Sequence, residues 1–234
     1  MNRIFIVCLT LALIEPKFAY TQNCPFPIIN TLEAYKKAVL MNKDNELVEI
    51  KKEIPSVMLD ITYATSKNIA EKPVYTMAAA FARKQVVASL KKIQQELNKQ
   101  GLGLKIFDGY RPYAVTCLFY AALRDTTFVA PPWRGSKHNR GCALDLTVID
   151  LKTGKELDMP SAYDEATERS YQSYDKCSPL QSANRKLLRD VMTANGFQIY
   201  PYEWWHFDFV GWEKYEIMDI DFEVLVNSKF KVQN

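Results

Sequence analysis

The clearest repeating pattern of apolar and polar positions lies within residues 83–100. Apolar side chains recur there at spacings of 4, 3 and 4 residues, the period of one face of an α-helix. The residues of this stripe are Val86, Leu90, Ile93 and Leu97. Gly101 then follows the helix, as glycine commonly does at a helix end. Shorter helices are predicted over residues 31–40, 112–124 and 183–194.

Short apolar runs between these helices predict strands. They cover residues 57–62, 104–107, 143–149 and 198–210, the last as one strand or a bent hairpin arm. Polar loops or loops rich in glycine and proline separate the elements, over residues 63–73, 128–141 and 150–180. Helices and strands mix without a regular βαβ alternation. The predicted fold class is therefore α+β, with a mainly antiparallel sheet flanked by helices.

The first residues carry a different pattern. Arg3 precedes an uncharged, mostly apolar run of eleven residues, 4–14, which Glu15 ends. Such a run is too short to cross a bilayer, which needs roughly 20 residues. It predicts a signal peptide over residues 1–22, with a buried N-terminal helix or strand as the alternative. We therefore expect residues 23–234 to form a domain that is exported, periplasmic or secreted, and without a stable membrane anchor.

Composition and charge narrow the class of protein. The chain has 234 residues, of which 48% are hydrophobic and 24% charged, as expected of one ordinary globular domain. The formal net charge is only +3, and lysine and arginine form no dense block. No nucleic-acid partner is therefore expected.

Five cysteines bear on the compartment. Cys8 falls in the predicted signal peptide, and the others are Cys24, Cys117, Cys142 and Cys177. Four cysteines in an oxidising compartment allow three pairings, and sequence does not choose among them. A bridge between Cys24 and Cys177 is one of the alternatives. None of these cysteines forms a C-x-x-C pair, which argues against a structural zinc site made of cysteines, and Cys142 is interpreted as a small packing residue.

The chain has only two histidines, and acidic residues accompany both. His138 lies in a loop that turns at Gly141 and leads into the strand over 143–149, which carries Asp145 between two leucines. An isolated buried carboxylate is costly. Asp145 therefore needs either a metal ion or a salt bridge.

The second histidine, His206, lies in an aromatic segment three residues after Glu203. A hydrogen-bonded pair in the core is one interpretation, and a metal-binding histidine beside a general base is the other. Imidazole and carboxylate ligands suit Zn²⁺, and three protein ligands leave a fourth position for water. Residues three apart in a regular strand point to opposite faces. We therefore expect a turn or a bulge between Glu203 and His206.

The segment Asp108-Gly109-Tyr110-Arg111-Pro112 joins a predicted strand to a predicted helix. An ordinary turn explains it, because glycine and proline mark turns without any function. The functional interpretation is that the guanidinium of Arg111 stabilises the oxyanion of a tetrahedral intermediate.

Together these segments resemble the zinc-dependent D-Ala-D-Ala dipeptidases, the family that includes the vancomycin-resistance dipeptidase. The segment over residues 136–145 matches the family pattern S-x-H-x-x-G-x-A-x-D at every fixed position. The segment over residues 203–206 matches E-x-W-H, and that over residues 108–112 matches D-G-Y-R-P. The resemblance extends over about residues 55–212.

The resemblance implies roles at the matched positions. His138, Asp145 and His206 would bind one Zn²⁺ per chain, in a site on the sheet. Glu203 would be the base that activates water, and Arg111 would stabilise the oxyanion. Related divalent ions suit similar ligands, so the identity of the metal stays open.

The resemblance also implies a small-molecule substrate, D-Ala-D-Ala or a peptide derived from peptidoglycan. Ser136 and Asp164 would help to hold its charged ends. Because of the predicted signal peptide, cell-wall peptide turnover or scavenging is a more fitting role than antibiotic resistance.

Two other functions compete with the dipeptidase. The first is a carboxypeptidase or endopeptidase that acts on peptidoglycan stem peptides, which needs an open cleft. The second is a zinc-stabilised binding domain without turnover, as in the signalling domain of Hedgehog proteins. Glu203 and Arg111 argue against the second, because a binding module needs neither a base nor an oxyanion group.

Overall fold

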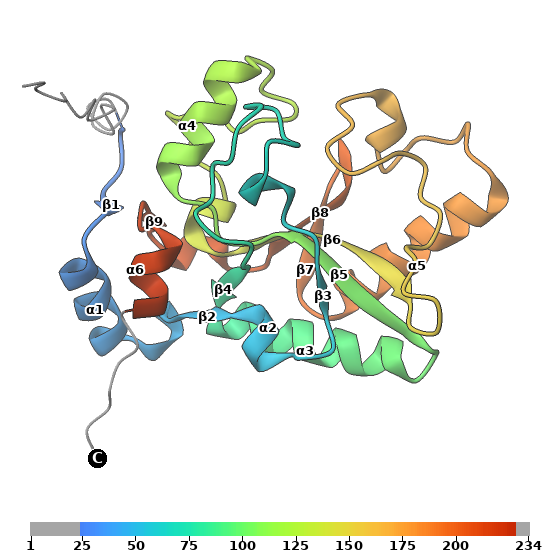
Figure 1. Ribbon diagram of the computed structural model, residues 1–234, viewed down its shortest axis with the longest axis horizontal. Helices are drawn as coiled ribbons and strands as arrows, with labels where there is room; N and C mark the ends of the chain where they lie inside the picture. Colours follow the sequence, from blue (N-terminus) through green and yellow to red (C-terminus); the bar gives the residue numbers. More distant parts are fainter. Residues whose placement is uncertain (1–23, 228–234) are drawn as a thin grey trace, which may run out of the picture.

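A five-stranded sheet forms the centre of the molecule (Figure 1). The computed structural model describes residues 24–227, so the predicted signal peptide over residues 1–22 lies outside the described residues. The order of strands across the sheet is β3 (Met58–Leu59), β5 (Leu102–Asp108), β6 (Ala143–Asp150), β8 (Glu203–Phe209) and β7 (Phe197–Tyr200). β3 runs parallel to β5, and every other neighbouring pair is antiparallel. The predicted α+β class with a mainly antiparallel sheet is confirmed.

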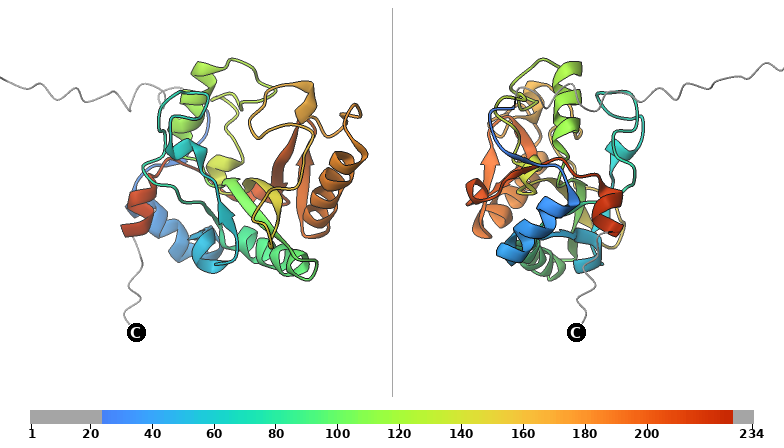
Figure 2. Two further views of the ribbon diagram at one scale, coloured as in Figure 1. Left: turned by 45° about the vertical axis from the view of Figure 1, so that its right-hand side comes forward. Right: turned by 90° about the vertical axis from the view of Figure 1, so that its left-hand side faces the viewer.

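Helices α3 (Lys84–Asn98) and α5 (Pro179–Ala194) lie on the side of the sheet away from α4 (Tyr113–Ala122) and the long loops (Figures 1 and 2). The predicted stripe of α3 is wholly buried, which explains why the 3.6-residue period was so clear. α5 begins four residues earlier than the pattern predicted. Ser178 caps it through a capping box with Gln181, and Pro179 occupies its first turn.

The predicted N-terminal helix is α1 (Leu32–Met41), and the hydroxyl of Thr31 caps it by accepting from the N–H of Ala34 at 3.2 Å. The remaining α-helices among residues 24–227 are short: α2 (Ile50–Glu53) and α6 (Phe222–Asn227). Single 3₁₀ turns complete the helical elements: η2 (Lys43–Asn45), η3 (Thr62–Ala64), η4 (His138–Arg140), η5 (Glu168–Ser170) and η6 (Trp212–Lys214).

Two small sheets tie distant segments together. β2 (Leu47–Glu49) pairs antiparallel with β4 (Phe81–Arg83), and β1 (Ile28–Ile29) pairs parallel with β9 (Ile217–Met218). The second pairing joins the first described segment to one of the last. Neither sheet was predicted, because strands of two or three residues are too short to show a period of two.

The described cysteines are all free thiols, so the bridge between Cys24 and Cys177 is absent. Cys24 packs instead against a small apolar cluster that contains Tyr113 and Cys117. Cys142 is fully buried, as expected of a small packing residue. Within residues 24–227 no helix is both long and apolar enough to span a membrane.

Candidate metal centre

Three side chains from different elements meet at one point on the sheet. His138 lies in η4, Asp145 in β6 and His206 in β8, and Asp145 and His206 are direct partners across the two strands. One nitrogen or oxygen atom of each lies within 4.8 Å of the others, and all three residues are buried. These are the three residues that the sequence patterns singled out as metal ligands.

The arrangement of atoms fits a cation. His206 Nδ1 lies 3.0 Å from Asp145 Oδ1 and 3.1 Å from His138 Nε2, and His138 Nε2 lies 3.4 Å from the same Asp145 oxygen. Two imidazole nitrogens and a carboxylate oxygen thus face one another in a buried space. Imidazole and carboxylate are the donors that Zn²⁺ and similar ions prefer, and three such ligands leave a position open.

Local structure fixes the orientation of His138. Its Nδ1–H donates to the carbonyl oxygen of Gly109 at 2.7 Å, which leaves Nε2 directed at Asp145 and His206. The chain then turns through Gly141 in the left-handed region, with φ of 68°. A Cβ at Gly141 would lie 2.5 Å from Leu47 Cδ2. Glycine is therefore required both by the backbone and by the space at the turn that separates His138 from Asp145.

Glu203 lies beside the cluster because the hairpin is irregular. Ile199 pairs with Phe207, but the next residue of β7, Tyr200, pairs with Glu203. This break in register brings Glu203 Oε2 to 3.6 Å from His206 Nδ1. The expected bulge between Glu203 and His206 is confirmed.

Arg111 is held against the cluster by its own turn. Its Nε donates to Asp108 Oδ2 at 3.0 Å, and its Nη2 lies 3.7 Å from Asp145 Oδ2. The backbone N–H of Arg111 donates to the carbonyl oxygen of His138 at 3.1 Å, which ties this turn to η4. The two motifs are therefore one structural unit.

Charges within the site shift the pKa of its members. Burial opposes ionisation of Asp145, but the imidazoles of His138 and His206 lower its pKa well below the usual range. Burial, together with the charges of Asp145 and Asp164, raises the pKa of Glu203 to about 8. Burial would lower the pKa of Arg111, but the charge of Asp108 raises it well above the ordinary value, so the guanidinium stays protonated.

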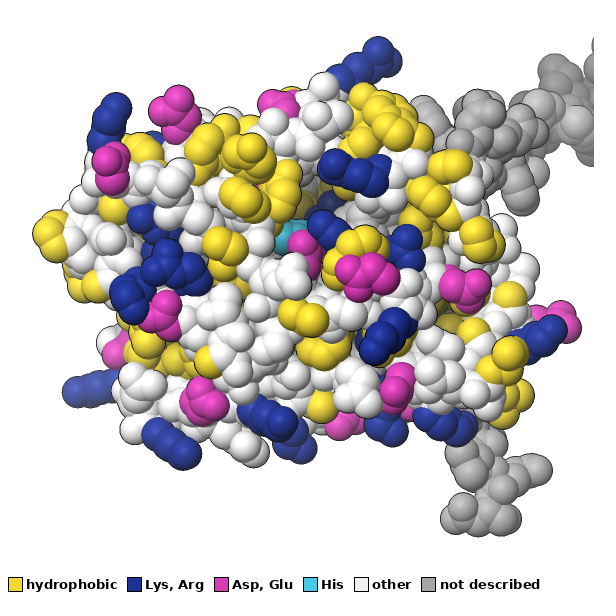
Figure 3. All heavy atoms as spheres, turned by 180° about the vertical axis from the view of Figure 1, so that it is seen from behind, with side chains coloured by type: hydrophobic (Ala, Val, Ile, Leu, Met, Phe, Trp, Pro, Cys, Tyr) yellow, Lys and Arg dark blue, Asp and Glu magenta, His cyan; other side chains and the backbone are white. Residues whose placement is uncertain are grey.

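A cavity of about 730 Å³ opens over the cluster. Figure 3 shows histidine and acidic side chains at the bottom of a hollow, with basic and hydrophobic side chains around it. Ser136 and Asp164, the two predicted substrate-binding residues, both line the cavity. Ser136 Oγ accepts from the N–H of His138 at 3.2 Å, and Asp164 Oδ2 accepts from the hydroxyl of Tyr63 at 2.8 Å.

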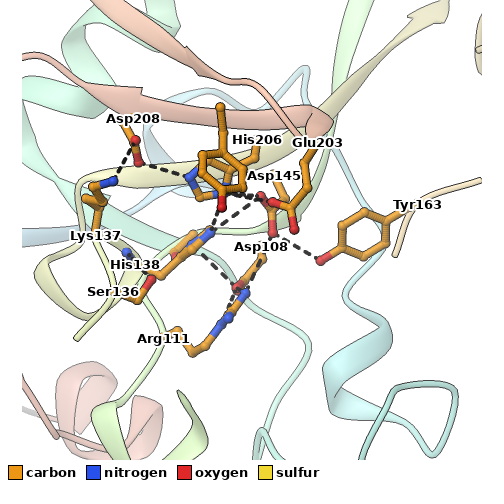
Figure 4. A network of polar contacts seen from close by, with 12 residues as sticks. Asp108, Arg111, Ser136, Lys137, His138, Asp145, Tyr163, Glu203, His206 and Asp208 are labelled. Atoms are coloured by element: carbon orange, nitrogen blue, oxygen red, sulfur yellow. Dashed lines mark hydrogen bonds and ion pairs between the residues drawn. The ribbon is translucent and has the colours of Figure 1, made fainter. Parts of the chain in front are cut away.

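The sequence analysis missed several residues of this polar network (Figure 4). Tyr163 donates toward Asp145 Oδ2 at 3.2 Å from the loop over 150–180, where no pattern distinguished it. Asp208 accepts from His206 Nε2–H at 2.9 Å, and Lys137 Nζ lies 3.1 Å from the other oxygen of Asp208. The strand period of two predicts this placement for Asp208, because residues 206 and 208 share a face.

Comparison with known proteins supplies relatives over most of the chain. The sequence model of a family described as D-Ala-D-Ala dipeptidase matches residues 43–224. A D-alanyl-D-alanine dipeptidase of Escherichia coli (strain K12) is 33% identical over 187 residues, which cover 80% of this chain and 96% of that protein. A D-alanyl-D-alanine dipeptidase of Enterococcus faecium is 33% identical over 174 residues, covering 66% of this chain and 86% of that protein.

Solved structures give looser likenesses. An LD-carboxypeptidase whose structure concerns peptidoglycan recognition superposes with a TM-score of 0.39 and 25% identity, covering 57% of this chain and 61% of that chain. A vancomycin-resistance D,D-dipeptidase in complex with a D-Ala-D-Ala phosphinate analogue gives a TM-score of 0.35 and 21% identity, covering 71% and 67%. The range matched by the family contains His138, Asp145 and His206, the three candidate metal ligands.

Proposed function

The chain belongs to the D-Ala-D-Ala dipeptidase family, and on that premise we propose that it is a metallopeptidase that hydrolyses D-Ala-D-Ala to two molecules of D-alanine. The observation that carries the proposal is the buried cluster of His138, Asp145 and His206 at the base of a cavity, with Glu203 Oε2 3.6 Å from His206 Nδ1. A metal site alone does not need a carboxylate beside it. A hydrolase does, because the attacking water must lose a proton.

The metal of this proposal is one Zn²⁺ per chain, held by His138, Asp145 and His206. Two imidazoles and one carboxylate form a three-ligand set of the kind that catalytic zinc sites use. When bound, the ion supplies Lewis-acid polarisation of water and of the peptide carbonyl.

The protein's own groups carry the proton and the developing charge. Glu203 takes a proton from the attacking water and delivers it to the nitrogen of the leaving D-alanine, so that the C–N bond breaks as the amine is released. The raised pKa of Glu203 suits a group that must first accept and then donate a proton. Arg111, which stays charged and is braced by Asp108, faces the oxygen of the former carbonyl as negative charge develops there.

The two ends of the dipeptide need opposite partners. Asp164 lines the cavity, where its Oδ2 accepts from the hydroxyl of Tyr63, and its carboxylate is assigned to the substrate ammonium. Ser136 lines the cavity next to Lys137 and is assigned to the substrate carboxylate. A zwitterionic dipeptide needs an acceptor for its ammonium and a hydrogen-bond donor for its carboxylate, and Asp164 and Ser136 are assigned these two roles.

We further propose that residues 1–22 direct export, so that the enzyme meets D-Ala-D-Ala released from cell-wall peptides outside the cytoplasm. The role is then turnover or scavenging of these peptides. Amino-terminal sequencing of the protein recovered from the extracytoplasmic fraction tests this part. A start between residues 20 and 23 is expected, and an intact Met1 in the cytoplasmic fraction contradicts it.

One observation favours a second candidate, a carboxypeptidase acting on peptidoglycan stem peptides. The cavity of about 730 Å³ has the size of a pocket for a drug-sized ligand, which is much larger than two alanines. An enzyme that cleaves longer peptides needs such room for the residues on the amino-terminal side of the cleaved bond.

The test is the release of D-alanine by the untagged protein from D-Ala-D-Ala and from a stem pentapeptide that ends in D-Ala-D-Ala, with L-Ala-L-Ala as the stereochemical control. The dipeptidase predicts rapid cleavage of free D-Ala-D-Ala, loss of activity after chelation and recovery on addition of Zn²⁺. Cleavage of the pentapeptide alone supports the second candidate. Turnover of neither peptide by the zinc-loaded protein contradicts both.

A further inference from the structure

The ring of His206 has different partners on its two nitrogens. Nδ1 faces the metal cluster, 3.0 Å from Asp145 Oδ1 and 3.1 Å from His138 Nε2. Nε2 points away from the cluster, and its hydrogen is donated to Asp208 Oδ1 at 2.9 Å. Since residues 206 and 208 share one face of β8, the carboxylate of Asp208 lies directly behind the ring.

Asp208 is itself held from its far side. Lys137 Nζ lies 3.1 Å from Asp208 Oδ2, and the same ammonium lies 5.4 Å from the ring centroid of Trp212. The side chain of Asp208 is only 8% exposed, so its charge must be compensated within the protein. Lys137 and His206 lie on its two oxygens and provide that compensation (Figure 4).

Lys137 also connects the two histidines. It directly precedes His138 in sequence, and its contact with Asp208 joins the loop that carries His138 to the strand that carries His206. A continuous polar chain therefore runs from Lys137 through Asp208 to the ring of His206. The other metal-binding histidine has its own anchor, the carbonyl oxygen of Gly109.

We propose that Asp208 and Lys137 are positioning residues of the metal centre, which keep the hydrogen of His206 on Nε2 and the lone pair of Nδ1 directed at the metal. This inference rests on the metal site of the proposed function. An acceptor behind a metal-binding imidazole fixes the tautomer and the ring orientation, and a carboxylate in that place also makes the ring a stronger ligand. Lys137 acts through Asp208, because it fixes the carboxylate and balances its charge.

A purely structural ion pair is the competing explanation. In that case Lys137 and Asp208 only fasten the loop to the strand, and their loss lowers stability without a specific effect on the metal. The chain offers a matched control, the exposed ion pair between Lys186 and Asp190 on α5, which lies outside the metal cluster.

The experiment measures the dissociation constant of Zn²⁺ for the untagged full chain by competition with a chromophoric chelator. Asp208→Ala is expected to weaken zinc binding by about 10–100-fold, the usual effect of removing such a partner. Asp208→Asn and Lys137→Met are expected to weaken it less, because each leaves an acceptor behind the ring. Asp190→Ala and Lys186→Met are expected to bind zinc as the wild type does.

A spectroscopic measurement separates positioning from stability. Because the chain has only two histidines, a long-range ¹H–¹⁵N correlation spectrum of the zinc-loaded protein contains only two imidazole rings. In the wild type, the ring of His206 should carry its hydrogen on Nε2, and that hydrogen should exchange slowly with solvent. In Asp208→Ala, that hydrogen should exchange much faster while the signals of His138 stay in place.

The inference is overturned if Asp208→Ala binds zinc with wild-type affinity and its His206 hydrogen is equally protected. It is also overturned if affinity falls only in proportion to a loss of stability that the Lys186–Asp190 variants share. If Asp208→Ala does not fold, Lys137→Met is tested instead. Wild-type zinc affinity together with wild-type protection of the His206 hydrogen in that variant then overturns the inference. A wild type that binds no zinc overturns the proposed function as well, whereas a wild type that binds zinc alongside an unaffected Asp208→Ala overturns this inference alone.

Discussion

At the scale of single residues, a metal ion and a proton compete for Nδ1 of His206. Burial opposes a charge on this ring, but the neighbouring carboxylates of Asp208 and Asp145 raise its pKa to about 10. At neutral pH the metal-free ring therefore carries hydrogens on both nitrogens. Zinc needs the lone pair of Nδ1, so that hydrogen must leave when the metal binds.

This competition predicts that zinc uptake releases about one proton from His206 between pH 7 and pH 9. Since the pKa is raised, the charged ring persists as pH rises toward 10, and zinc affinity should increase by about tenfold per pH unit over that range. Calorimetric titration in buffers of different ionisation enthalpy counts the protons released. A net release near zero at pH 7.5, with zinc still bound, would falsify the assignment of His206 as the protonated ligand.

The sequence was most informative at this scale where residue types are rare. With only two histidines, both accompanied by carboxylates, the residues indicated two candidate segments, and the resemblance to the dipeptidase family joined them into one ligand set before the fold was known. Tyr163 could not be found in the same way, because it reaches Asp145 from an irregular loop. Asp208 was accessible to the period-two argument but was overlooked beside its aromatic neighbours.

At the scale of elements, the turn at Gly141 sets the distance between two ligands. It lies between η4, which carries His138, and β6, which carries Asp145. Its positive φ disfavours any side chain, and Leu47 occupies the space that a Cβ would need. Gly154 has nearly the same φ, 69°, but nothing lies within 4 Å of its Cβ position.

Alanine substitutions at Gly141 and Gly154 therefore test whether the turn at Gly141 shapes the metal site, with Gly154 as the control. Gly154→Ala should lower the free energy of unfolding by about 1–2 kcal/mol, the cost of the left-handed backbone alone. Gly141→Ala should lower it by about 1–3 kcal/mol more, because Leu47 must move. Zinc affinity should fall only in Gly141→Ala. Urea unfolding and chelator competition measure the two quantities, and equal effects of both variants would contradict this account of the turn.

Long elements followed from the sequence because their apolar residues are buried. α3 buries one face, which appears as a 3.6-residue period, whereas β6 is buried on both faces and appears as a nearly continuous apolar run. The start of α5 was placed four residues late, although Ser178, Pro179 and Gln181 form a recognisable cap. Apolar spacing begins only after the first turn of this helix, so its cap was the better signal.

At the scale of the whole molecule, Arg83 joins segments that are far apart in sequence. It is almost completely buried, and its guanidinium donates to the carbonyl oxygens of Asn45, Arg140 and Glu216, at 2.7 Å to Arg140 and 3.2 Å to Glu216. These oxygens belong to the N-terminal region, to the turn between His138 and Asp145, and to the C-terminal region. No local pattern predicts such a residue, because its partners come together only in the folded chain.

Loss of this guanidinium should therefore destabilise the entire fold. Arg83→Met removes the hydrogen bonds from the charged guanidinium to three carbonyl oxygens, and a hydrogen bond to a charged group contributes about 1.5–3 kcal/mol. We expect the free energy of unfolding to fall by at least about 3 kcal/mol, seen as a lower urea midpoint at an unchanged slope. Arg189→Met, at a partly exposed arginine of α5, should change it by less than about 0.5 kcal/mol. A similar midpoint for both variants would show that Arg83 does not unite these segments.

The central claim is that His138, Asp145 and His206 hold a metal on which Glu203 works as the base. Its most direct test is the rate of D-Ala-D-Ala hydrolysis by Glu203→Gln, measured together with metal content in the same preparation. Exposed Glu213→Gln serves as the control. The account predicts full zinc occupancy in all three proteins and a fall in kcat of about 10²–10⁴-fold in Glu203→Gln alone. A zinc-loaded Glu203→Gln that turns over at the wild-type rate would contradict it.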